Sequence, residues 1–447
     1  MTRSTPLLTP MTRCVWRILP WLLSVPVAAS AQNLVDLVTA AQGYDATYRS
    51  AKAQFDANVA KADQARAAIL PTIGLAAGAS TTSQEVQPMA ARSYNTQSLG
   101  MSATQPLYRP ANWAGYQQGL KSVDIAKAQL TQAEQDLLVR VSQAYFDVLS
   151  ATDTLSVIKN QKKAVSEQLA SAKRNFEVGT ATITDTRDAQ ARFDLVVAQQ
   201  LAAENDLLVK SLALNQLVGM SNAQPKPLKA PTTLPSVAPA DVAHWVDQSQ
   251  TTNPSVQQAT IALDMARLEV AKAEAGHKPT LDLVGSYSAI NNNGGNSAST
   301  ADSRINVASV GLNLTIPLFA GFALQNRVKE TLSLEEKAVS DLENAKRSVA
   351  QGTRAAFYGV QSGQAQVAAL QAAEASSQSA LEANQLGYQV GVKINIDVLN
   401  AQTQLFDTQA KLAKARYDVL LGNLKLRQVV GTLQAQDLQA INAQLAP

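Results

Sequence analysis

The chain offers few side chains for catalytic chemistry. It has two histidines, His244 and His277, and one cysteine, Cys14. The sequence contains no Gly-x-Gly-x-x-Gly or phosphate-binding loop, no His-Glu-x-x-His motif and no pair of cysteines. A metal or acid–base centre would therefore have to be built from carboxylates, and no converging set of them stands out. We expect a protein that is not an enzyme and that binds no cofactor.

Composition and charge exclude two further classes. The 447 residues are 46% hydrophobic and only 16% charged, which excludes a disordered chain. Lys and Arg number 38 against 35 Asp and Glu, so the net charge of +3 lacks the concentrated positive field that nucleic acid binding requires. We therefore expect no nucleic acid partner. The bulk of the chain is Ala, Gln, Leu, Val and Ser, which favours long helices.

The first 31 residues have the features of a secretory signal. Three arginines precede an apolar stretch, and the small residues Ala29-Ser30-Ala31 fit a cleavage site before Gln32. The alternative is a membrane anchor, which needs about 20 uninterrupted apolar residues. Pro20 and Pro26 interrupt this shorter stretch, so cleavage is the prediction. Cys14 leaves with the signal, and the exported chain then has no cysteine for disulfides or thiol chemistry.

Two long intervals without proline, 111–224 and 318–446, carry apolar residues every three or four positions. This period predicts amphipathic helices. Each interval is broken once near its middle, at Phe176-Glu-Val-Gly179-Thr180 and at Tyr388-Gln-Val-Gly391-Val392. A glycine flanked in this way predicts a tight turn between antiparallel helices.

The similarity of the two breaks extends into an internal repeat. Phe176 aligns with Tyr388, Asp185 aligns with Asp397, and the Gln-Leu-Val-Gly that ends at Gly219 aligns with the Gln-Val-Val-Gly that ends at Gly431. A tandem duplication is therefore predicted. The expected organisation is a signal peptide at 1–31; a first repeat at 32–222, with a helix, a strand pair at 72–83 and 96–105 and a helical hairpin at 111–220; a Pro-rich linker at 223–253; a second repeat at 254–434, with a helix, a strand pair at 280–289 and 304–316 and a hairpin at 320–430; and a C-terminal tail at 435–447.

The predicted strands alternate apolar residues with small or polar ones, as in Ile73 and Leu75 against Thr72 and Gly74. Strands of about ten residues with one apolar face, joined by polar loops, are typical of a transmembrane barrel wall. The alternative is the edge of a soluble β-sandwich. Four strands cannot close a barrel, so the barrel would be shared between chains.

Four aromatic residues lie where the strands give way to helices, and they fit an inner aromatic belt at the membrane interface. The alternative is ordinary packing between helices. These residues are Tyr108, Trp113, Phe319 and Phe322.

With these features the sequence resembles the TolC family of outer membrane channels, which serve multidrug efflux and type I secretion. The motifs in common are the strand ends Pro106-Leu107-Tyr108 and Pro317-Leu318-Phe319, the helix-turn segments, the run Ala415-Arg-Tyr-Asp-Val-Leu420 and Gly431-Thr-Leu433. The resemblance implies an α+β membrane protein of a Gram-negative outer membrane. Its homotrimer would form a twelve-stranded barrel in outer membrane lipid, continuous with a long periplasmic helical tunnel and an equatorial belt.

In function the resemblance implies an exit duct that passively conducts drugs or unfolded protein. Its partners would be a periplasmic adaptor, or membrane fusion protein, and an inner-membrane pump or ABC transporter. The alternative that the sequence leaves open is a soluble periplasmic coiled-coil adaptor or scaffold.

The resemblance also implies roles at the two turns. The adaptor would dock at Val178, Gly179, Thr180, Val390, Gly391 and Val392. Thr184, Asp185, Tyr388 and Lys393 would form a periplasmic gate, with a hydrogen bond between Tyr388 and Asp185, and Asp397 would form an acidic ring at the entrance. The family carries arginine at the position of Lys393 and a second aspartate at that of Asn400, so the ring has one acid here. A solvated helix cap or charged turn is the alternative for Asp185, Asp397 and Lys393.

Overall fold

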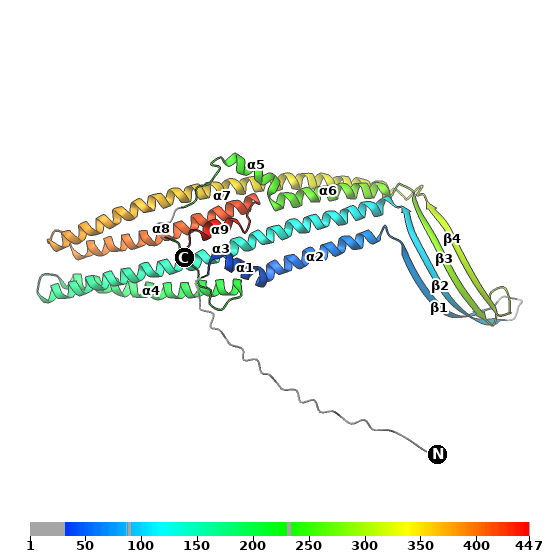
Figure 1. Ribbon diagram of the computed structural model, residues 1–447, viewed down its shortest axis with the longest axis horizontal. Helices are drawn as coiled ribbons and strands as arrows, with labels where there is room; N and C mark the ends of the chain where they lie inside the picture. The colour runs from blue at the N-terminus through cyan, green and yellow to red at the C-terminus, as the bar shows by residue number, and fades with distance from the viewer. Residues whose placement is uncertain (1–31, 86, 88–90, 230–233, 447) are drawn as a thin grey trace, which may run out of the picture.

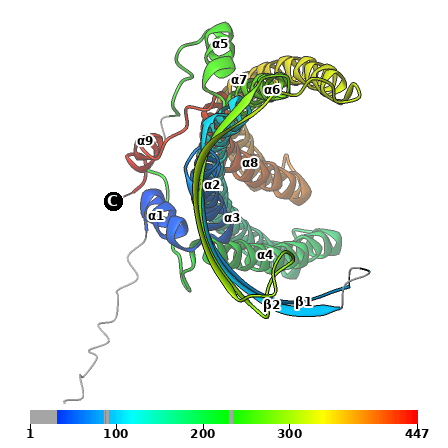
Figure 2. The same ribbon diagram turned by 90° about the vertical axis from the view of Figure 1, so that its right-hand side faces the viewer.

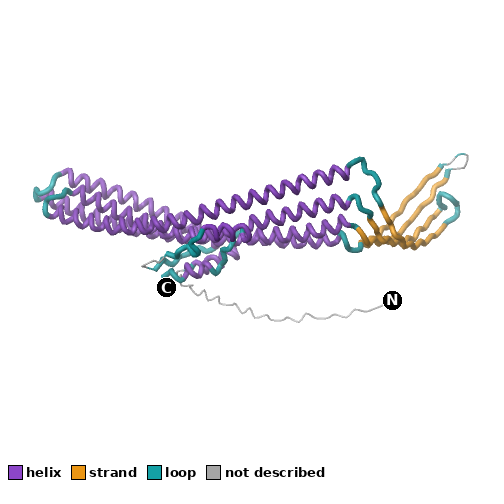
Figure 3. Tube along the Cα trace, turned by 90° about the horizontal axis from the view of Figure 1, so that it is seen from above, coloured by secondary structure: helices purple, strands orange, loops and turns teal. Residues whose placement is uncertain are grey.

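The computed structural model describes residues 32–85, 87, 91–229 and 234–446. The predicted signal at 1–31 lies outside the described residues. The chain is elongated, with a β-sheet at one end and helices over the rest of its length (Figures 1 and 3). The two repeats run side by side along this long axis, and each contributes two strands and one long helical hairpin.

The sheet consists of β1 (Thr72–Gln84), β2 (Arg92–Tyr108), β3 (Thr280–Asn293) and β4 (Ser303–Thr315). The strands are antiparallel and lie in the order β1-β2-β3-β4. The second strand is longer than the predicted 96–105, because its pairing with β1 continues to Gln84 opposite Arg92. The added residues are mostly polar, so they complete the backbone ladder without extending the apolar alternation on which the prediction depended.

One face of the sheet is apolar and exposed. Aligned rows such as Leu75, Met101 and Tyr287 run across the strands on this face. The opposite face carries small and polar side chains, such as Gly74, Ser102 and Ser286. Figure 2 shows that the sheet curves as an arc and that the long helices follow the same arc.

Two long helices carry the chain away from the sheet, α3 (Pro110–Glu177) and α7 (Ala323–Gln389). The 68 residues of α3 span about 100 Å at 1.5 Å per residue. Each long helix is accompanied by two shorter ones in turn. These are α2 (Ala46–Ala67) and α6 (Pro254–Ala275) near the sheet, and α4 (Ile183–Val218) and α8 (Asn395–Val430) near the far end. No helix in the described part of the chain is long and apolar enough to cross a membrane.

An ion pair holds the sheet to the helices. Arg109, the residue before α3, donates from Nε and Nη2 to the two carboxylate oxygens of Asp282 in β3, at 2.7 and 2.5 Å. Asp282 is buried. Such a fork fixes both the distance and the orientation of its partners. The joint therefore ties the first repeat to the second where strands end and helices begin.

Around the middle of the helices lie α1 (Leu34–Tyr44), α5 (Val242–Thr252) and α9 (Asp437–Asn442). These three helices lie on the convex side of the arc (Figure 2). The largest buried cluster is here, and it joins both termini of the described chain to the long helices. Its bulky members include Leu34, Tyr145, Phe146, Leu420 and Leu438.

Two buried or half-buried aspartates join elements in this middle region, with opposite consequences for their pKa. Asp45 accepts a fork from Arg140 at 3.0 Å, which lowers the pKa of that carboxyl below its usual 3.8. Asp153 in α3 accepts from the Tyr417 hydroxyl in α8 at 2.6 Å. Burial raises the pKa of Asp153, because the charged form loses its hydration.

Candidate functional site at the helical tips

The two predicted turns lie together at the end of the molecule farthest from the sheet (Figure 1). Gly179 and Gly391 adopt left-handed conformations, with φ of 77° and 82°. In each turn the residue after the glycine donates its backbone N–H to a carbonyl five residues earlier, Thr180 to Asn175 and Val392 to Gly387, both at 2.8 Å. This arrangement satisfies carbonyls at the helix end and reverses the chain.

Exposed apolar side chains lie at both turns. Val178, Val390 and Val392 are between 66% and 79% exposed. Nothing lies within 4 Å of the position that a Cβ would occupy on Gly179 or Gly391. The turns therefore present open backbone and uncovered apolar side chains at the tip.

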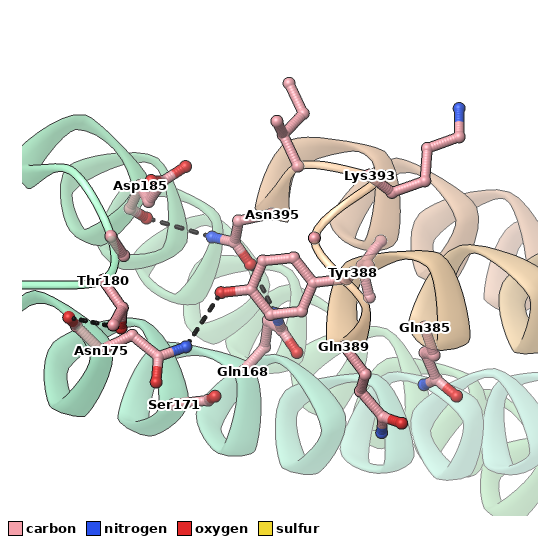
Figure 4. Close-up of a pocket in the computed structure, with 14 residues that line it drawn as sticks. Gln168, Ser171, Asn175, Thr180, Asp185, Gln385, Tyr388, Gln389, Lys393 and Asn395 are labelled. Carbon is pink, nitrogen blue, oxygen red and sulfur yellow. Dashed lines mark hydrogen bonds between the residues drawn. The ribbon is translucent and has the colours of Figure 1, made fainter.

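Side-chain hydrogen bonds connect the two hairpins just behind the turns (Figure 4). Asn175 in α3 donates from Nδ2 to the Tyr388 hydroxyl in α7 at 3.2 Å. Asn395, 1% exposed at the start of α8, accepts from Gln168 Nε2 at 2.5 Å and donates to the backbone oxygen of Asp185 at 3.1 Å. One residue of the second repeat thus contacts both helices of the first hairpin.

The prediction of a hydrogen bond between Tyr388 and Asp185 is wrong for this chain. Thr182 and Asp185 form a reciprocal cap at the start of α4: the Asp185 carboxylate accepts from the Thr182 N–H at 3.0 Å and from its hydroxyl at 2.8 Å. The Tyr388 hydroxyl instead accepts a hydrogen bond from Asn175. The alternative interpretation of Asp185, a helix cap, describes these contacts. Thr184 lies beside it in the first turn of α4 and is exposed.

Lys393 and Asp397 form an ion pair within the second hairpin, with 3.6 Å between Nζ and Oδ2. The Lys393 ammonium points away from Asp185 (Figure 4). Asn400, one turn further along α8, accepts from Arg192 of α4 at 2.9 Å. At the position where the resemblance implied a second acid, an amide therefore forms a contact between hairpins.

A polar hollow of about 790 Å³ lies between the hairpins at this tip. It is lined by side chains from all four long tip helices, including Gln168, Asn175, Asp185, Tyr388 and Lys393. Across the described ranges no three His, Cys, Asp or Glu side chains are grouped as metal ligands would be. The side chains around this hollow hold the two hairpins together through a few hydrogen bonds that can break when the hairpins separate.

The four predicted belt aromatics lie where strands meet helices, and all four are exposed. Tyr108 is the last residue of β2, and Trp113 lies in the first turn of α3 with its ring 5.8 Å from that of Tyr116. The rings of Phe319 and Phe322 meet edge to face at 5.4 Å.

Sequence reasoning missed Gln168, Asn175 and Asn395, although their bonds join the hairpins. Amides inside long Gln- and Asn-containing helices have no distinguishing local signal. A weak signal did exist at Thr182, where a threonine three residues before an acid is the pattern of a capping box.

Comparisons with known proteins agree with this architecture. The model of the outer membrane efflux protein family matches residues 37–220 and 245–432, one segment in each repeat. Outer membrane protein TolC of Vibrio cholerae serotype O1 is 35% identical over 418 residues, which cover 94% of this chain and 95% of that protein. The alkaline protease secretion protein AprF of Pseudomonas aeruginosa is 28% identical over 437 residues, or 96% of this chain and 90% of that protein.

The fold is also that of a solved structure, outer membrane protein VceC from Vibrio cholerae. The two superpose with a TM-score of 0.77 at 19% sequence identity, over 89% of this chain and 96% of that one.

The fold class is that of these channels: an α+β membrane protein with four strands per chain, which in a trimer form a twelve-stranded barrel continuous with a long helical tunnel. The protein is an outer membrane protein with a large periplasmic part, and it serves as an exit duct for efflux or type I secretion. Family and fold are those of a channel rather than of an enzyme. With the family model matched in both repeats, the chain belongs to the TolC family of outer membrane efflux proteins.

Proposed function

We propose that the helical tip is the periplasmic gate of the exit duct. The observation that carries this proposal is that polar side-chain bonds, such as Asn175 to Tyr388 and Gln168 to Asn395, connect the hairpins at this end. Each bond contributes about 0.5–1.5 kcal/mol. Contacts of this size can keep the hairpins together at rest and still separate when a partner binds the separated arrangement more tightly.

The partner at the tip is a periplasmic adaptor, which couples the duct to an inner-membrane pump or ABC transporter. The exposed valines at 178, 390 and 392 support a protein contact here, because exposed apolar patches mark interaction sites. The backbone at Gly179 and Gly391 is open to close approach. Thr180 and Thr184 provide hydroxyls near these exposed valines.

Asp397 sets the charge preference of the entrance. Three copies of this carboxylate around the axis favour cations, and the Lys393 ammonium, 3.6 Å away, offsets part of that field. Asp397→Asn is therefore expected to lower the cation preference of single channels in planar bilayers, whereas Lys393→Gln raises it. Changes in the same direction for both variants would contradict this role.

Nothing in the fold or among the relatives supports the alternative of a soluble coiled-coil adaptor or scaffold.

Crosslinking tests the gate, because the mature chain contains no cysteine once the predicted signal is removed. Asn175→Cys combined with Tyr388→Cys places thiols on the two hairpins, and a short bifunctional thiol reagent is expected to stop export in cells. A cleavable reagent restores export on reduction.

The matched control is Asn175→Cys with Ala181→Cys. Both positions lie in one hairpin, where the Ala181 N–H contacts the Asn175 carbonyl at 3.1 Å. Crosslinking within one hairpin leaves the other free, so export continues. Full export with Asn175 and Tyr388 joined would show that the gate lies elsewhere.

A further inference from the structure

A row of polar side chains crosses the apolar face of the sheet near the end away from the helices. Backbone pairing aligns Gln97 of β2 with Asn291 of β3, and Asn291 with Arg304 of β4. All three residues are exposed. In the described part of the chain none of their side chains has a hydrogen-bond or ion-pair partner. They line one hollow of about 430 Å³ together with Leu99 and Ala289.

This row lies on the lipid-facing side. Arg304 is separated from Val310, Leu312 and Leu314 by even numbers of residues in an unbroken register, so it shares their face. From Thr315 to Arg304 the strand β4 rises about 3.3 Å per residue, or about 36 Å, which a tilt of about 45° reduces to about 26 Å along the membrane normal. Since the apolar band of such barrels is about 25 Å tall, Arg304 lies just beyond it. The helices are periplasmic, so this is the outer leaflet.

A second hollow continues from this row toward the helices. It has a volume of about 330 Å³ and lies over the small residue Gly285, between Met101, Tyr287 and Val310. Its lining is mostly apolar on the same face of the sheet. A polar hollow at the interface followed by an apolar one in the hydrocarbon has the shape of a lipid headgroup and acyl chain.

We propose that this double hollow is a binding site for a phosphorylated glycolipid of the outer leaflet. Arg304 pairs with a headgroup phosphate, because a guanidinium matches phosphate geometry with two parallel N–H bonds. The amides of Gln97 and Asn291 provide donors and acceptors for sugar hydroxyls. An acyl chain lies over Gly285. A trimer therefore holds three such lipids.

This site belongs to one face of the sheet, as a comparison of Arg92 with Arg304 shows. Arg92 lies near the same end, but it is five residues from Gln97 and so faces the other way. Its guanidinium donates to the backbone oxygen of Ser297 at 2.5 Å. Arg92 on the inner face is thus hydrogen-bonded within the protein, whereas the Arg304 guanidinium on the lipid face can bind a ligand.

Native mass spectrometry of the trimer in detergent, titrated with bis-phosphorylated lipid A, tests the site. Up to three lipids are expected to bind, and Arg304→Gln should weaken binding about tenfold or more, as loss of a charged hydrogen bond does. Arg92→Gln is the matched control and should leave binding unchanged. Equal binding by wild type and Arg304→Gln would overturn the proposal.

The apolar hollow is tested separately. A Cβ on Gly285 would meet only the Ser309 backbone oxygen, at 3.9 Å, so the backbone accepts a side chain here. Gly285→Leu would occupy the hollow and should also weaken lipid A binding. Gly311→Leu, on the inner face with nothing within 4 Å, is its control. Dephosphorylated lipid A, phosphatidylglycerol and inorganic phosphate distinguish the ligand. Phosphatidylglycerol binding as tightly as lipid A, or inorganic phosphate displacing lipid A at equal concentration, would overturn the assignment.

Discussion

Asn175 donates a hydrogen bond to the hydroxyl of Tyr388 across 3.2 Å, and so joins two hairpin ends that are 213 positions apart in the chain. The bond links the first repeat to the second near the end of the long helix in each, one residue away from the aligned pair Phe176 and Tyr388. Asp185, meanwhile, caps its own helix together with Thr182. The contacts that hold this tip together are therefore amides and a phenol, and charged groups contribute at its margins.

Removing this bond should favour the open channel. Tyr388→Phe loses about 1 kcal/mol per chain, or about 3 kcal/mol over three copies, which shifts an open–closed equilibrium on the order of a hundredfold. Planar-bilayer conductance of the purified protein should rise several-fold. Asn175→Ala should have the same effect, and combining the two should add little, because both remove one interaction. Fully additive increases would show that the two residues act separately.

Asn395 should matter more than an exposed asparagine of the same helix. Asn395→Ala removes a buried side chain and leaves the Gln168 amide and the Asp185 carbonyl, both partly buried, without their partner, at a cost of about 1–3 kcal/mol. We expect a lower thermal midpoint of the trimer and a more open tip, measured by circular dichroism and bilayer conductance. Asn400→Ala removes one exposed bond to Arg192 and serves as the control. Equal effects for both variants would contradict the importance of burial.

The glycine turns should tolerate only residues that accept a left-handed backbone. Gly391→Val requires a β-branched residue at φ of 82°, which costs on the order of 1–2 kcal/mol, and it adds a side chain at the proposed docking surface. Export is expected to fall while trimer levels stay normal. Gly391→Asn is the comparison, since asparagine visits this conformation readily. Normal export by the valine variant would argue against docking at this turn.

Two aspartates should respond to pH in opposite directions. The folded-state pKa of Asp45 is lowered by Arg140, so its contribution to stability is present above pH 3.8 and is lost as pH falls through the lower folded value. Asp45→Asn should destabilise the protein at pH 7 and weaken its sensitivity to acid. Thermal midpoints measured from pH 3 to pH 7 provide the test.

Asp153 has the reverse sign. Burial raises its folded-state pKa, so its most favourable contribution is below pH 3.8 and is lost as pH rises through the folded value. Asp153→Asn can still accept the Tyr417 hydroxyl without burying a charge, and it should raise the thermal midpoint at pH 7. A loss of stability at pH 7 would show that the charged bond to Tyr417 outweighs the burial of Asp153.

The sequence by itself determined the repeat, the two glycine turns and the strands. These features depend on local periodicity and on the conformational freedom of Gly179 and Gly391, which neighbouring residues reveal. It also placed the aromatic residues at the junction. It did not determine how far β2 extends, because polar residues join a ladder only when a partner strand lies beside them.

Only the tertiary structure decided which side chains meet. Asn175, Tyr388 and Asn395 come together because two hairpins from distant segments pack side by side, and no local pattern encodes that pairing. Likewise, the row of Gln97, Asn291 and Arg304 exists only through strand register. Asp185 shows the reverse case, since its helix cap with Thr182, three residues earlier, was encoded locally.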